Sequence, residues 1–516
     1  MTSPSEKLAE SLEVLRKIQG RGIIAVQAKD LSRTHRERLL KNGFLQEVMK
    51  GWYIPTRQDE TAGESTAWYA SFWNFCSAYL NKRFGNEWCL SPEQSLAFHA
   101  GNQTVPQQLF IRSPKGRNKI TPLPHKTSLF DARYPMPEKN EIEIINNMRV
   151  YSLCSALIYC TPRVFIQNPT DARTALSLVR DASEILGLLL AGGHSTIAGR
   201  IAGGFRNIGR NRIADEIIKT MTTAGYDIRE NDPFNSVSTV SVLNRERSPH
   251  VNRMRILWQE MREIVLAHFP KAPGRPANSK AYLKQVKETY VTDAYHSLSI
   301  EGYRVNAELI ERVRTGKWDP DNVENDKEHT AALAARGYWL AFKSVEISIG
   351  KAIKGMNPGK IFDEDHRDWY REMFAPCVTA GIIKPADLAG YRREQVYIRR
   401  SMHIPPDSDA IRDLMPDFCE LLTKEPNAAV RVVLGHFFFV NIHPYMDGNG
   451  RIGRFLMNVM LASGGYPWVI IPVEQRSKYM AALEDASVRQ NITPFCKFLA
   501  ALVTNRLKSD VPLEIK

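Results

Sequence analysis

The feature that most restricts the fold of this chain is a short polar loop between two apolar helical segments. Residues 428–442 and 452–463 are both mainly apolar and have the length of a buried helix. Between them the sequence reads His443-Pro-Tyr-Met-Asp-Gly-Asn-Gly-Arg451. Gly448 and Gly450 allow a backbone to turn tightly, so the pattern predicts two core helices joined by a compact loop.

The residue types of this loop suit a bound polyphosphate. The run Gly448-Asn449-Gly450 lets backbone N–H groups point inward as an anion nest. Arg451 and Arg454 follow at the start of a helix, whose N-terminal dipole also attracts phosphate. Asp447 offers a hard oxygen ligand suited to Mg²⁺, and His443 can accept a hydroxyl proton at neutral pH.

The stretch His443–Arg454 resembles the signature of the Fic family, HPFx(D/E)GNGRxxR, with Tyr445 where phenylalanine is commoner. The resemblance implies a transferase that moves AMP from ATP, with Mg²⁺, onto a Ser, Thr or Tyr hydroxyl of a target protein or of itself. His443 would deprotonate that hydroxyl, and Asp447 would hold the metal between the α- and β-phosphates. The implied ATP-binding residues are Gly448, Asn449, Gly450, Arg451, Arg454 at the γ-phosphate and Tyr479 at the adenine.

A second motif precedes the loop by about 150 residues. Ser297-Leu-Ser-Ile-Glu301-Gly302 resembles the (S/T)xxxE(G/N) inhibitory motif of the same family, in the class whose inhibitory helix is N-terminal to the catalytic core. The resemblance implies that Ser297, Glu301 and Gly302 form an autoinhibitory element, with Glu301 taking the place of the γ-phosphate at Arg454. The alternative is an ordinary helix end with a charged residue before glycine.

A third segment, Tyr391–Pro406, resembles the flap of the family, a short β-hairpin upstream of the active site. In the family an exposed strand there pairs with the backbone of the target, which is β-augmentation. The resemblance assigns this role to Val396, Tyr397 and Ile398. A plain surface hairpin is the alternative.

Three other patterns favour structural roles. His436 lies on the apolar segment 428–442 and is interpreted as a buried histidine. Gly448–Gly453 fits the dinucleotide-binding pattern GxGxxG, but the polar residues His443–Asp447 stand where an apolar strand is required. The glycine-rich stretch Gly192–Gly204 lacks the Gly-Lys-Ser/Thr ending of a phosphate loop, which favours close helix packing.

The N-terminal region, residues 1–57, has the pattern of a winged helix. Helices are expected at Glu6–Gln19, Val26–Leu31 and Arg33–Lys41, followed by a hairpin of Phe44–Met49 and Trp52–Ile54. The order resembles the start of AbiEi-type antitoxins and related regulators, which implies DNA as a partner. A solvated charged face is the alternative. The residues expected to contact DNA are Arg33, Arg36, Arg38, Lys41 and Lys50.

Residues 58–268 are expected to form an α+β middle region. Trp88–Leu90, Ser91–Ala100 and Gln108–Ile111 predict strand, helix, strand, and 171–190 and 211–224 predict helices. A proline-rich linker is expected at 269–279, followed by the Fic domain at 280–516. The expected fold is therefore mainly α: a helical Fic domain with a short hairpin flap, behind a winged helix and an α+β middle domain.

Composition sets the class of protein. The 516 residues carry 69 Lys and Arg against 56 Asp and Glu, a balance compatible with nucleic acid or with nucleotides. The seven cysteines form no CxxC pair, so a reducing cytoplasm is the expected location. No signal peptide is expected, and the longest apolar run, near 185–191, is too short to cross a membrane.

The motifs leave alternatives open. Transfer of UMP, GMP or phosphocholine would use the same residues as transfer of AMP. A DNA-binding regulator with a secondary Fic activity is a rival of a different class. The sequence does not name the target protein, nor does it decide whether the chain also removes AMP.

Overall fold

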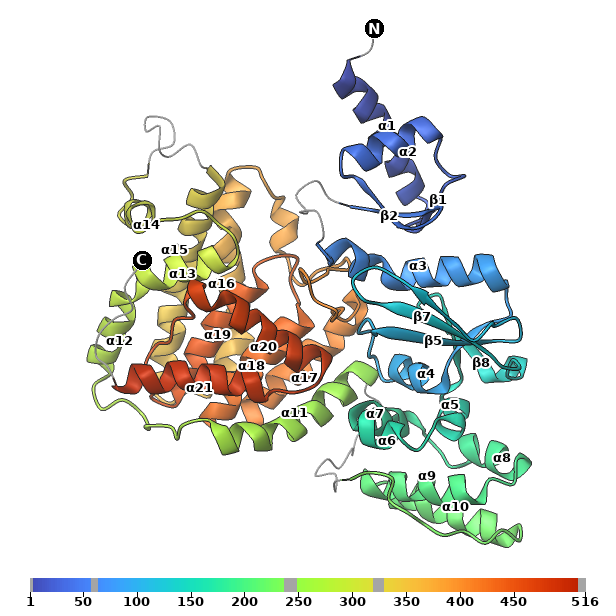
Figure 1. Ribbon diagram of the computed structural model, residues 1–516. Helices are drawn as coiled ribbons and strands as arrows, with labels where there is room; N and C mark the ends of the chain where they lie inside the picture. The colour runs from blue at the N-terminus through green and yellow to red at the C-terminus, as the bar shows by residue number, and fades with distance from the viewer. Residues whose placement is uncertain (1–2, 57–63, 236–247, 319–328, 509–516) are drawn as a thin grey trace. The chain divides into compact units, whose positions relative to one another are not determined.

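The computed structural model describes residues 3–56, 64–235, 248–318 and 329–508, and the chain folds into two compact units (Figure 1). The first unit is Met1–Ile256 with Tyr397–Ile404, and the second is Leu257–Val396 with Pro405–Lys516. The boundary falls inside one helix, α11 (Pro249–His268), and not at a linker.

The segment 269–279, expected to be a linker between domains, belongs to the second unit. The Tyr466 hydroxyl donates to the Pro270 carbonyl at 2.6 Å, and the Gly274 N–H donates to the Gly464 carbonyl at 3.0 Å. The proline-rich composition therefore reflects an extended segment packed on the helical core, and this expectation was wrong.

The N-terminal part of the first unit contains two helices and a small sheet. They are α1 (Pro4–Gln19), β1 (Val26–Gln27), α2 (Arg33–Lys41), β2 (Leu45–Met49) and β3 (Trp52–Pro55), with strand order β1-β3-β2. Ser3 and Glu6 form a capping box that starts α1, and the Ser32 side chain caps α2.

The second helix expected at Val26–Leu31 is absent. Val26 pairs with Tyr53 in the sheet, and the Asp30 carboxylate accepts the backbone N–H of Gln27 at 2.8 Å. Val26 and Leu31 of this segment are buried in a strand and at the end of a turn, so a six-residue pattern was too short to separate helix from strand.

A four-stranded sheet organises the middle of the first unit. The strands β4 (Cys89–Leu90), β5 (Gln108–Ser113), β6 (Lys119–Pro122) and β7 (Ser128–Arg133) lie in the order β4-β5-β7-β6, with β5 and β7 parallel. Helix α4 (Pro92–His99) connects β4 to β5, which confirms the expected strand, helix, strand. Helix α3 (Thr66–Phe84) packs its aromatic side chains on the face that carries Leu109 and Leu129. A separate hairpin consists of β8 (Ile142–Ile145) and β9 (Met148–Tyr151).

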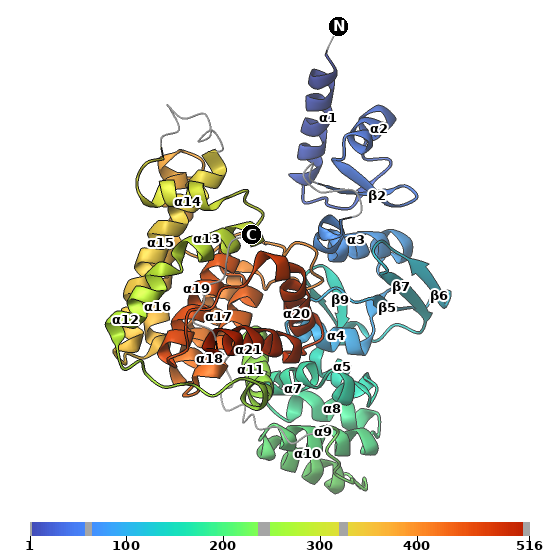
Figure 2. The same cartoon turned by 60° about the vertical axis from the view of Figure 1, so that its left-hand side comes forward.

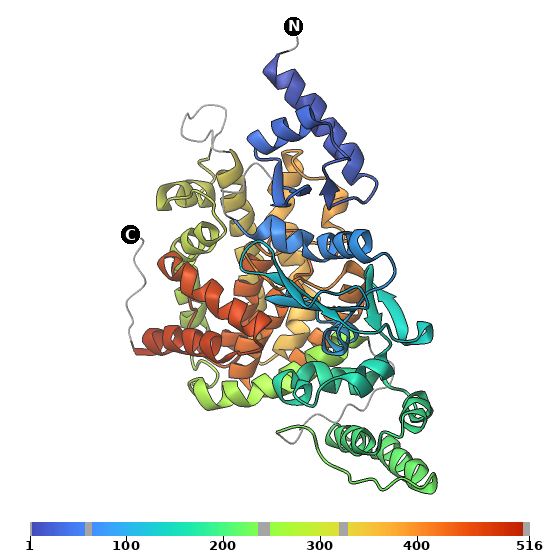
Figure 3. The ribbon, with the colours of Figure 1, turned by 45° about the vertical axis from the view of Figure 1, so that its right-hand side comes forward.

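The rest of the first unit is helical. The helix expected over 171–190 is divided into α7 (Pro169–Leu178) and α8 (Ser183–Ala191), because Val179 is extended and the Asp181 carboxylate accepts the Ser183 N–H. The other helices are α5 (Leu153–Tyr159), α6 (Val164–Gln167), α9 (Ser195–Asn207) and α10 (Asn211–Thr223). Helices α9 and α10 lie side by side (Figures 2 and 3).

The glycine-rich stretch lies mostly on α9 and serves close packing. A Cβ on Gly199 would collide with the Arg229 carbonyl, and one on Gly203 would collide with the Asn231 carbonyl. The chain after α10 therefore runs directly against the helix backbone, and the structural interpretation of this stretch is confirmed.

The described residues of the second unit contain helices and no β-strand. Helices α18 (Ala428–Ile442) and α19 (Asn449–Ser463) are buried along nearly their whole length. The helices around them are α12 (Ser279–Glu288), α13 (Tyr290–Ile300), α14 (Ala307–Arg314), α15 (His329–Ile353), α16 (Pro358–Thr379), α17 (Ser408–Lys424), α20 (Arg476–Val488) and α21 (Thr493–Lys508). None of the helices in the described ranges is long and apolar enough to span a bilayer.

Candidate active site

The loop between α18 and α19 is held in one conformation by its own residues. His443 ends α18 with a left-handed backbone, φ 54°, and Gly448 begins α19 with φ 82°. A Cβ on Gly448 would lie 2.8 Å from the Phe374 ring, so only glycine fits there. The Asn449 side chain accepts the Tyr445 N–H at 2.9 Å and donates to the Tyr445 carbonyl at 2.8 Å. Asn449 thus braces the loop, and its expected contact with phosphate stays a prediction.

His443 is prepared to accept a proton at one nitrogen. Its Nδ1 lies 3.1 Å from the Val440 carbonyl, which only accepts hydrogen bonds, so Nδ1 carries the proton and Nε2 keeps its lone pair. Burial lowers the pKa of His443, and the nearby Arg392 acts in the same direction. The Arg392 guanidinium donates to the His443 carbonyl at 2.8 Å, and its backbone N–H donates to the Pro444 carbonyl at 2.9 Å.

Asp447 projects toward solvent beside the N-terminus of α19. Its side chain is 66% exposed, and it accepts the Gly448 N–H at 2.6 Å and an Arg451 N–H at 3.1 Å. The Arg451 guanidinium is buried between two rings, 5.4 Å from the centroid of Tyr303 and 5.1 Å from that of Phe374.

The described ranges contain no group of three or more His, Cys, Asp or Glu side chains placed to hold a metal. A single exposed carboxylate nevertheless fits Mg²⁺, which is commonly bound by one or two carboxylates together with substrate phosphates and water. Asp447 is the residue of this loop that would hold the ion.

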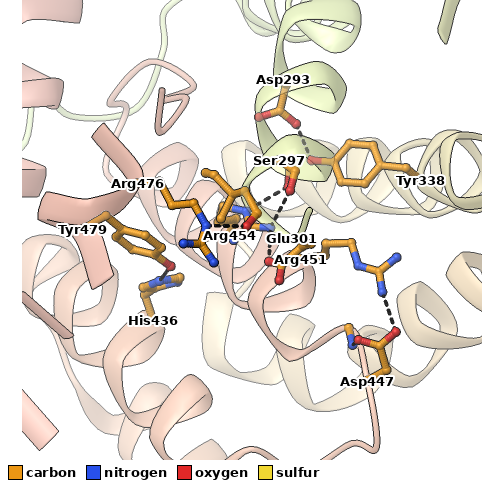
Figure 4. Close-up of polar contacts among 12 residues, drawn as sticks. Asp293, Ser297, Glu301, Tyr338, His436, Asp447, Arg451, Arg454, Arg476 and Tyr479 are labelled. Atoms are coloured by element: carbon orange, nitrogen blue, oxygen red, sulfur yellow. Dashed lines mark hydrogen bonds and ion pairs between the residues drawn. The ribbon is translucent and has the colours of Figure 1, made fainter. Parts of the chain in front are cut away.

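Arg454 is bound through two of its nitrogens by the segment that carries the second motif (Figure 4). Its Nη2 donates to the Glu301 carboxylate at 2.6 Å, and its Nε donates to the Ser297 hydroxyl at 2.8 Å. Burial alone would raise the pKa of Glu301, but the cations of Arg454 and Arg451 outweigh it and the pKa is lowered. Glu301 is therefore ionised at neutral pH. A Cβ on Gly450 would collide with the Glu301 carboxylate, so the close approach needs glycine at that position.

Helix α13 is anchored by further contacts that the motif search missed (Figure 4). Buried Asp293 accepts the Tyr338 hydroxyl at 2.6 Å and the Trp468 indole N–H at 3.0 Å. Arg476, at the start of α20, donates to the Ile300 carbonyl at 2.7 Å. Asp293 precedes Ser297 by four residues and Glu301 by eight, so helical periodicity was a signal that could have found it.

His436 and Tyr479 form a buried pair below the loop. The His436 Nε2 lies 2.7 Å from the Tyr479 hydroxyl, and burial lowers the pKa of His436 to about 4. The structural interpretation of His436 is therefore confirmed. Tyr479 is 1% exposed and packs against Phe495 and Phe498. Its place inside the helical core gives it a structural role, and its contact with adenine stays a prediction.

The expected flap does not form a hairpin. Residues 391–406 contain no strand, and 397–404 join the first unit. The Arg399 and Arg400 side chains pair with Glu64, whose side chain is fully buried. The Met402 carbonyl accepts the Val105 N–H at 2.9 Å, and Ile404 lies in the aromatic core around α3. The extended pattern here reflects docking on another part of the chain, and target binding by Val396, Tyr397 and Ile398 stays a prediction.

Three of the five basic residues expected to contact DNA are engaged within the N-terminal fold. Arg36 donates to the Ala28 carbonyl at 3.0 Å, and Arg38 donates to the Ser11 hydroxyl at 2.8 Å. Arg33 pairs with Glu37 at 2.7 Å on the exposed face of α2. Lys41 and Lys50 are exposed. DNA contact by this region stays a prediction.

The dinucleotide-binding alternative is excluded by the element that precedes the glycines. Gly448–Gly453 follows a loop and helix α18, whereas the fingerprint requires a strand leading into the first glycine.

Comparison with known proteins agrees with this geometry. Residues 364–461 match the model of the Fic/DOC family, a range that includes α18, the loop and most of α19. This range of the chain is therefore similar to the Fic/DOC family.

Curated relatives match about half of this chain. The protein adenylyltransferase Fic of Drosophila willistoni is 33% identical over 296 residues, which are 55% of this chain and 54% of the relative. The protein of the same name from Drosophila melanogaster is 34% identical over 239 residues, 44% of this chain and 45% of the relative. This chain thus spans about half the length of the curated relatives it matches.

Solved structures give a looser match to the whole chain. Fic-1 of C. elegans, residues 134–508, is 19% identical with a TM-score of 0.37, covering 63% of this chain and 90% of that chain. A Fic domain-containing signalling protein of Bacteroides thetaiotaomicron is 15% identical with a TM-score of 0.33, covering 49% of this chain and 95% of that chain.

Proposed function

We propose that this chain transfers AMP from ATP to a hydroxyl group of a protein side chain, with His443 as the general base. The observation that carries the proposal is the hydrogen bond from His443 Nδ1 to the Val440 carbonyl, which leaves Nε2 free to accept a proton beside the N-terminus of α19. The lowered pKa keeps the imidazole neutral, and hence competent as a base, at physiological pH.

The reaction breaks one bond and forms one. The target hydroxyl gives its proton to His443 Nε2 while its oxygen attacks the α-phosphorus. The bond between that phosphorus and the bridging oxygen of the β-phosphate breaks, and pyrophosphate leaves. The unpaired N–H groups of the first turn of α19 and the cation of Arg451 stabilise the negative charge. A Mg²⁺ ion held by Asp447 would supply further charge neutralisation at the phosphates.

The resting enzyme is autoinhibited by Glu301. Its carboxylate binds the guanidinium of Arg454, the cation that we expect to hold the γ-phosphate. With Arg454 engaged, ATP binds with its α-phosphate out of line with the attacking hydroxyl. Misplacement by about 1 Å lowers such a rate by roughly a hundredfold. Glu301 therefore reduces the rate without altering the catalytic loop.

The test uses the full chain carrying Glu301→Gly, incubated with Mg²⁺ and with ATP labelled at either the α- or the γ-phosphate. We expect α-label on protein, no γ-label, and a rate on the order of a hundredfold above the parent. Glu301→Gly with His443→Ala is the matched control, and we expect its labelling to fall on the order of 10²- to 10⁴-fold. Arg454→Ala removes the γ-phosphate ligand together with the inhibitory pair, so it should not activate.

The outcomes separate the alternatives. Retained γ-label would indicate phosphorylation, and label from UTP, GTP or a phosphocholine donor in preference to ATP would move the assignment to another Fic transferase. Undiminished adducts in the His443→Ala control would contradict the base. Mass spectrometry of the labelled chain and of lysate proteins identifies the modified Ser, Thr or Tyr, self-modification included. We infer a cytoplasmic location from the scattered cysteines.

A further inference from the structure

One face of the sheet in the first unit carries large apolar side chains that no described element covers. Along β5 the side chains alternate, so that Leu109 and Ile111 are buried while Phe110 is 42% exposed. Phe130 pairs with Phe110 across β5 and β7, and Ile120, which is 54% exposed, pairs with Phe130 across β6 and β7. The three side chains form a row across three adjacent strands, which we call the aromatic row.

The two rings of this row lie next to each other, with their planes inclined at 58°. The ring centroids of Phe110 and Phe130 lie 5.5 Å apart. At one end of β5 the guanidinium of Arg112 lies 4.2 Å from the centroid of the exposed Tyr134 ring. By the alternation of β5, Arg112 shares its face with Phe110, so aromatic and cationic groups lie together on this side of the sheet.

The strands and loops that carry the row, residues 108–134, are mainly basic. The range 108–134 contains a single acidic residue, Asp131, which is buried and bonded to Arg83. The basic residues of the same range are Arg112, Lys115, Arg117, Lys119, Lys126 and Arg133. Lys115 pairs with Glu87, whereas Arg117, Lys119 and Lys126 are exposed and make no ion pair within the described ranges.

We propose that this sheet face binds single-stranded nucleic acid, with bases stacked on the aromatic row and phosphates near Arg117 and Lys126. Lys119 pairs with Asp131 across β6 and β7 and therefore lies on the opposite face. Exposed rings on a sheet can stack on the flat faces of unpaired bases. In a duplex these faces are covered by the neighbouring base pairs, so the rings favour single strands. The cations complement a phosphate backbone, and the lack of an exposed acidic side chain within 108–134 disfavours a basic partner. This binding is independent of the AMP transfer proposed above.

The experiment measures fluorescence anisotropy of labelled 20-nucleotide oligo-dT and oligo-U with the full chain, from 50 to 200 mM salt, and of a 20-base-pair duplex under the same conditions. We expect both single strands to bind more tightly than the duplex, with affinity that falls as salt rises. The ratio of the two single-strand affinities tells whether DNA or RNA is preferred. Phe110→Ala should weaken single-strand binding about fivefold or more.

Matched variants separate stacking from other causes. Phe110→Tyr should retain binding while Phe110→Leu, which keeps apolar surface without a ring, should lose it. Charge reversal by Arg117→Glu with Lys126→Glu should weaken binding and lower the salt dependence, whereas Lys82→Glu, an exposed cation on α3, should do neither. Ile144→Ala on β8, which is 65% exposed, is the control for loss of an unrelated apolar side chain. Thermal unfolding of each variant shows that it is folded.

Three results would overturn the proposal. The first is parental affinity in folded Phe110→Ala or Phe110→Leu. The second is loss of single-strand binding only on charge reversal of Lys41 and Lys50 in the N-terminal part, which would place the nucleic acid there. The third is an absence of oligonucleotide binding together with self-association that Phe110→Ala abolishes, which would make the row an interface between copies of this chain.

Discussion

His443 combines an unusual backbone with a fixed side chain. Its left-handed conformation is uncommon for a residue with a Cβ, and it turns the chain sharply from the end of α18 into the loop. The same geometry brings Nδ1 to the Val440 carbonyl, so backbone shape and tautomer are set together. A single residue thus ends a helix and fixes the orientation of the proposed base.

The lowered pKa of His443 predicts the acid limit of the reaction. A base must be neutral, so transfer is lost only when the pH falls through the pKa of His443, which lies below the usual 6.5. Glu301 raises that pKa, and its removal shifts the limit lower still. In a pH profile of AMP transfer by Glu301→Gly, we expect the midpoint of the acid limb below 6.5. A midpoint at or above 6.5 would contradict the assignment of His443 as a desolvated base.

Asp293 makes the stability of the second unit depend on pH. Burial raises its pKa to about 6, partly offset by the bonds from Tyr338 and Trp468. The folded chain therefore holds this proton more tightly than the unfolded chain, and the stability it contributes is lost as pH rises through about 6. We expect the unfolding temperature to fall less from pH 5 to pH 7.5 in Asp293→Asn than in the parent. Equal changes in calorimetry would show that Asp293 does not titrate in this range.

At the scale of elements, α13 is attached to the helical core by hydrogen bonds along its whole length. Asp293 near its start accepts the Trp468 N–H, Ser297 and Glu301 both accept from Arg454, and the Ile300 carbonyl in its last turn accepts from Arg476. The proposed inhibition would therefore depend on the position of the whole helix, and not on the Glu301 carboxylate alone.

Arg476→Ala tests this dependence because it removes one anchor and leaves the catalytic loop and Glu301 in place. We expect basal AMP transfer to rise several-fold, to a level between the parent and Glu301→Gly, since the Ile300 carbonyl loses a charge-assisted hydrogen bond. Arg489→Ala, near the C-terminal end of α20 and paired with Asp485 at the surface, is the control. Basal activity at or below the parental level in Arg476→Ala would contradict the dependence of inhibition on the attachment of α13.

Sequence patterns predicted the elements whose signals are local. The helix–loop–helix at 428–463 was expected because glycines and apolar periodicity specify it directly. The approach of Glu301 to Arg454 was expected only from the resemblance to the Fic family. The helix expected at 26–31 and the hairpin at 391–406 were wrong, because both segments take their shape from distant partners such as Tyr53 and Val105. Arg392 and Arg476 were missed as supports, since no local pattern shows which carbonyl a distant arginine reaches.

At the scale of the whole molecule, the segment 397–404 belongs to the first unit although the residues before and after it belong to the second. We call this segment the excursion, and no sequence pattern predicted it. Its contacts with Glu64, Thr66 and Val105 are separated from it by about 300 residues of chain. Domains predicted from composition are each one uninterrupted range of residues. The expected division into 1–57, 58–268, 269–279 and 280–516 therefore could not assign 397–404 to the first unit.

Glu64→Gln tests how firmly the excursion is held. The buried carboxylate accepts from both Arg399 and Arg400, and the amide loses this charge pairing. We expect limited trypsin digestion to cut after Arg399 and Arg400 several-fold faster in the variant. Glu87→Gln, which breaks the exposed pair with Lys115, should digest like the parent. Equal cleavage in Glu64→Gln and the parent would show that the segment is held by its other contacts.

The excursion also limits how this chain can be divided or recombined. A fragment that ends at residue 256 lacks Ile404, which fills part of its own aromatic core, and a fragment that starts at residue 257 carries that side chain with no core to receive it. The second unit therefore cannot be fused to another N-terminal region at a single junction. A working chimera needs two exchanges, one at the helix α11 and one across 397–404, made together.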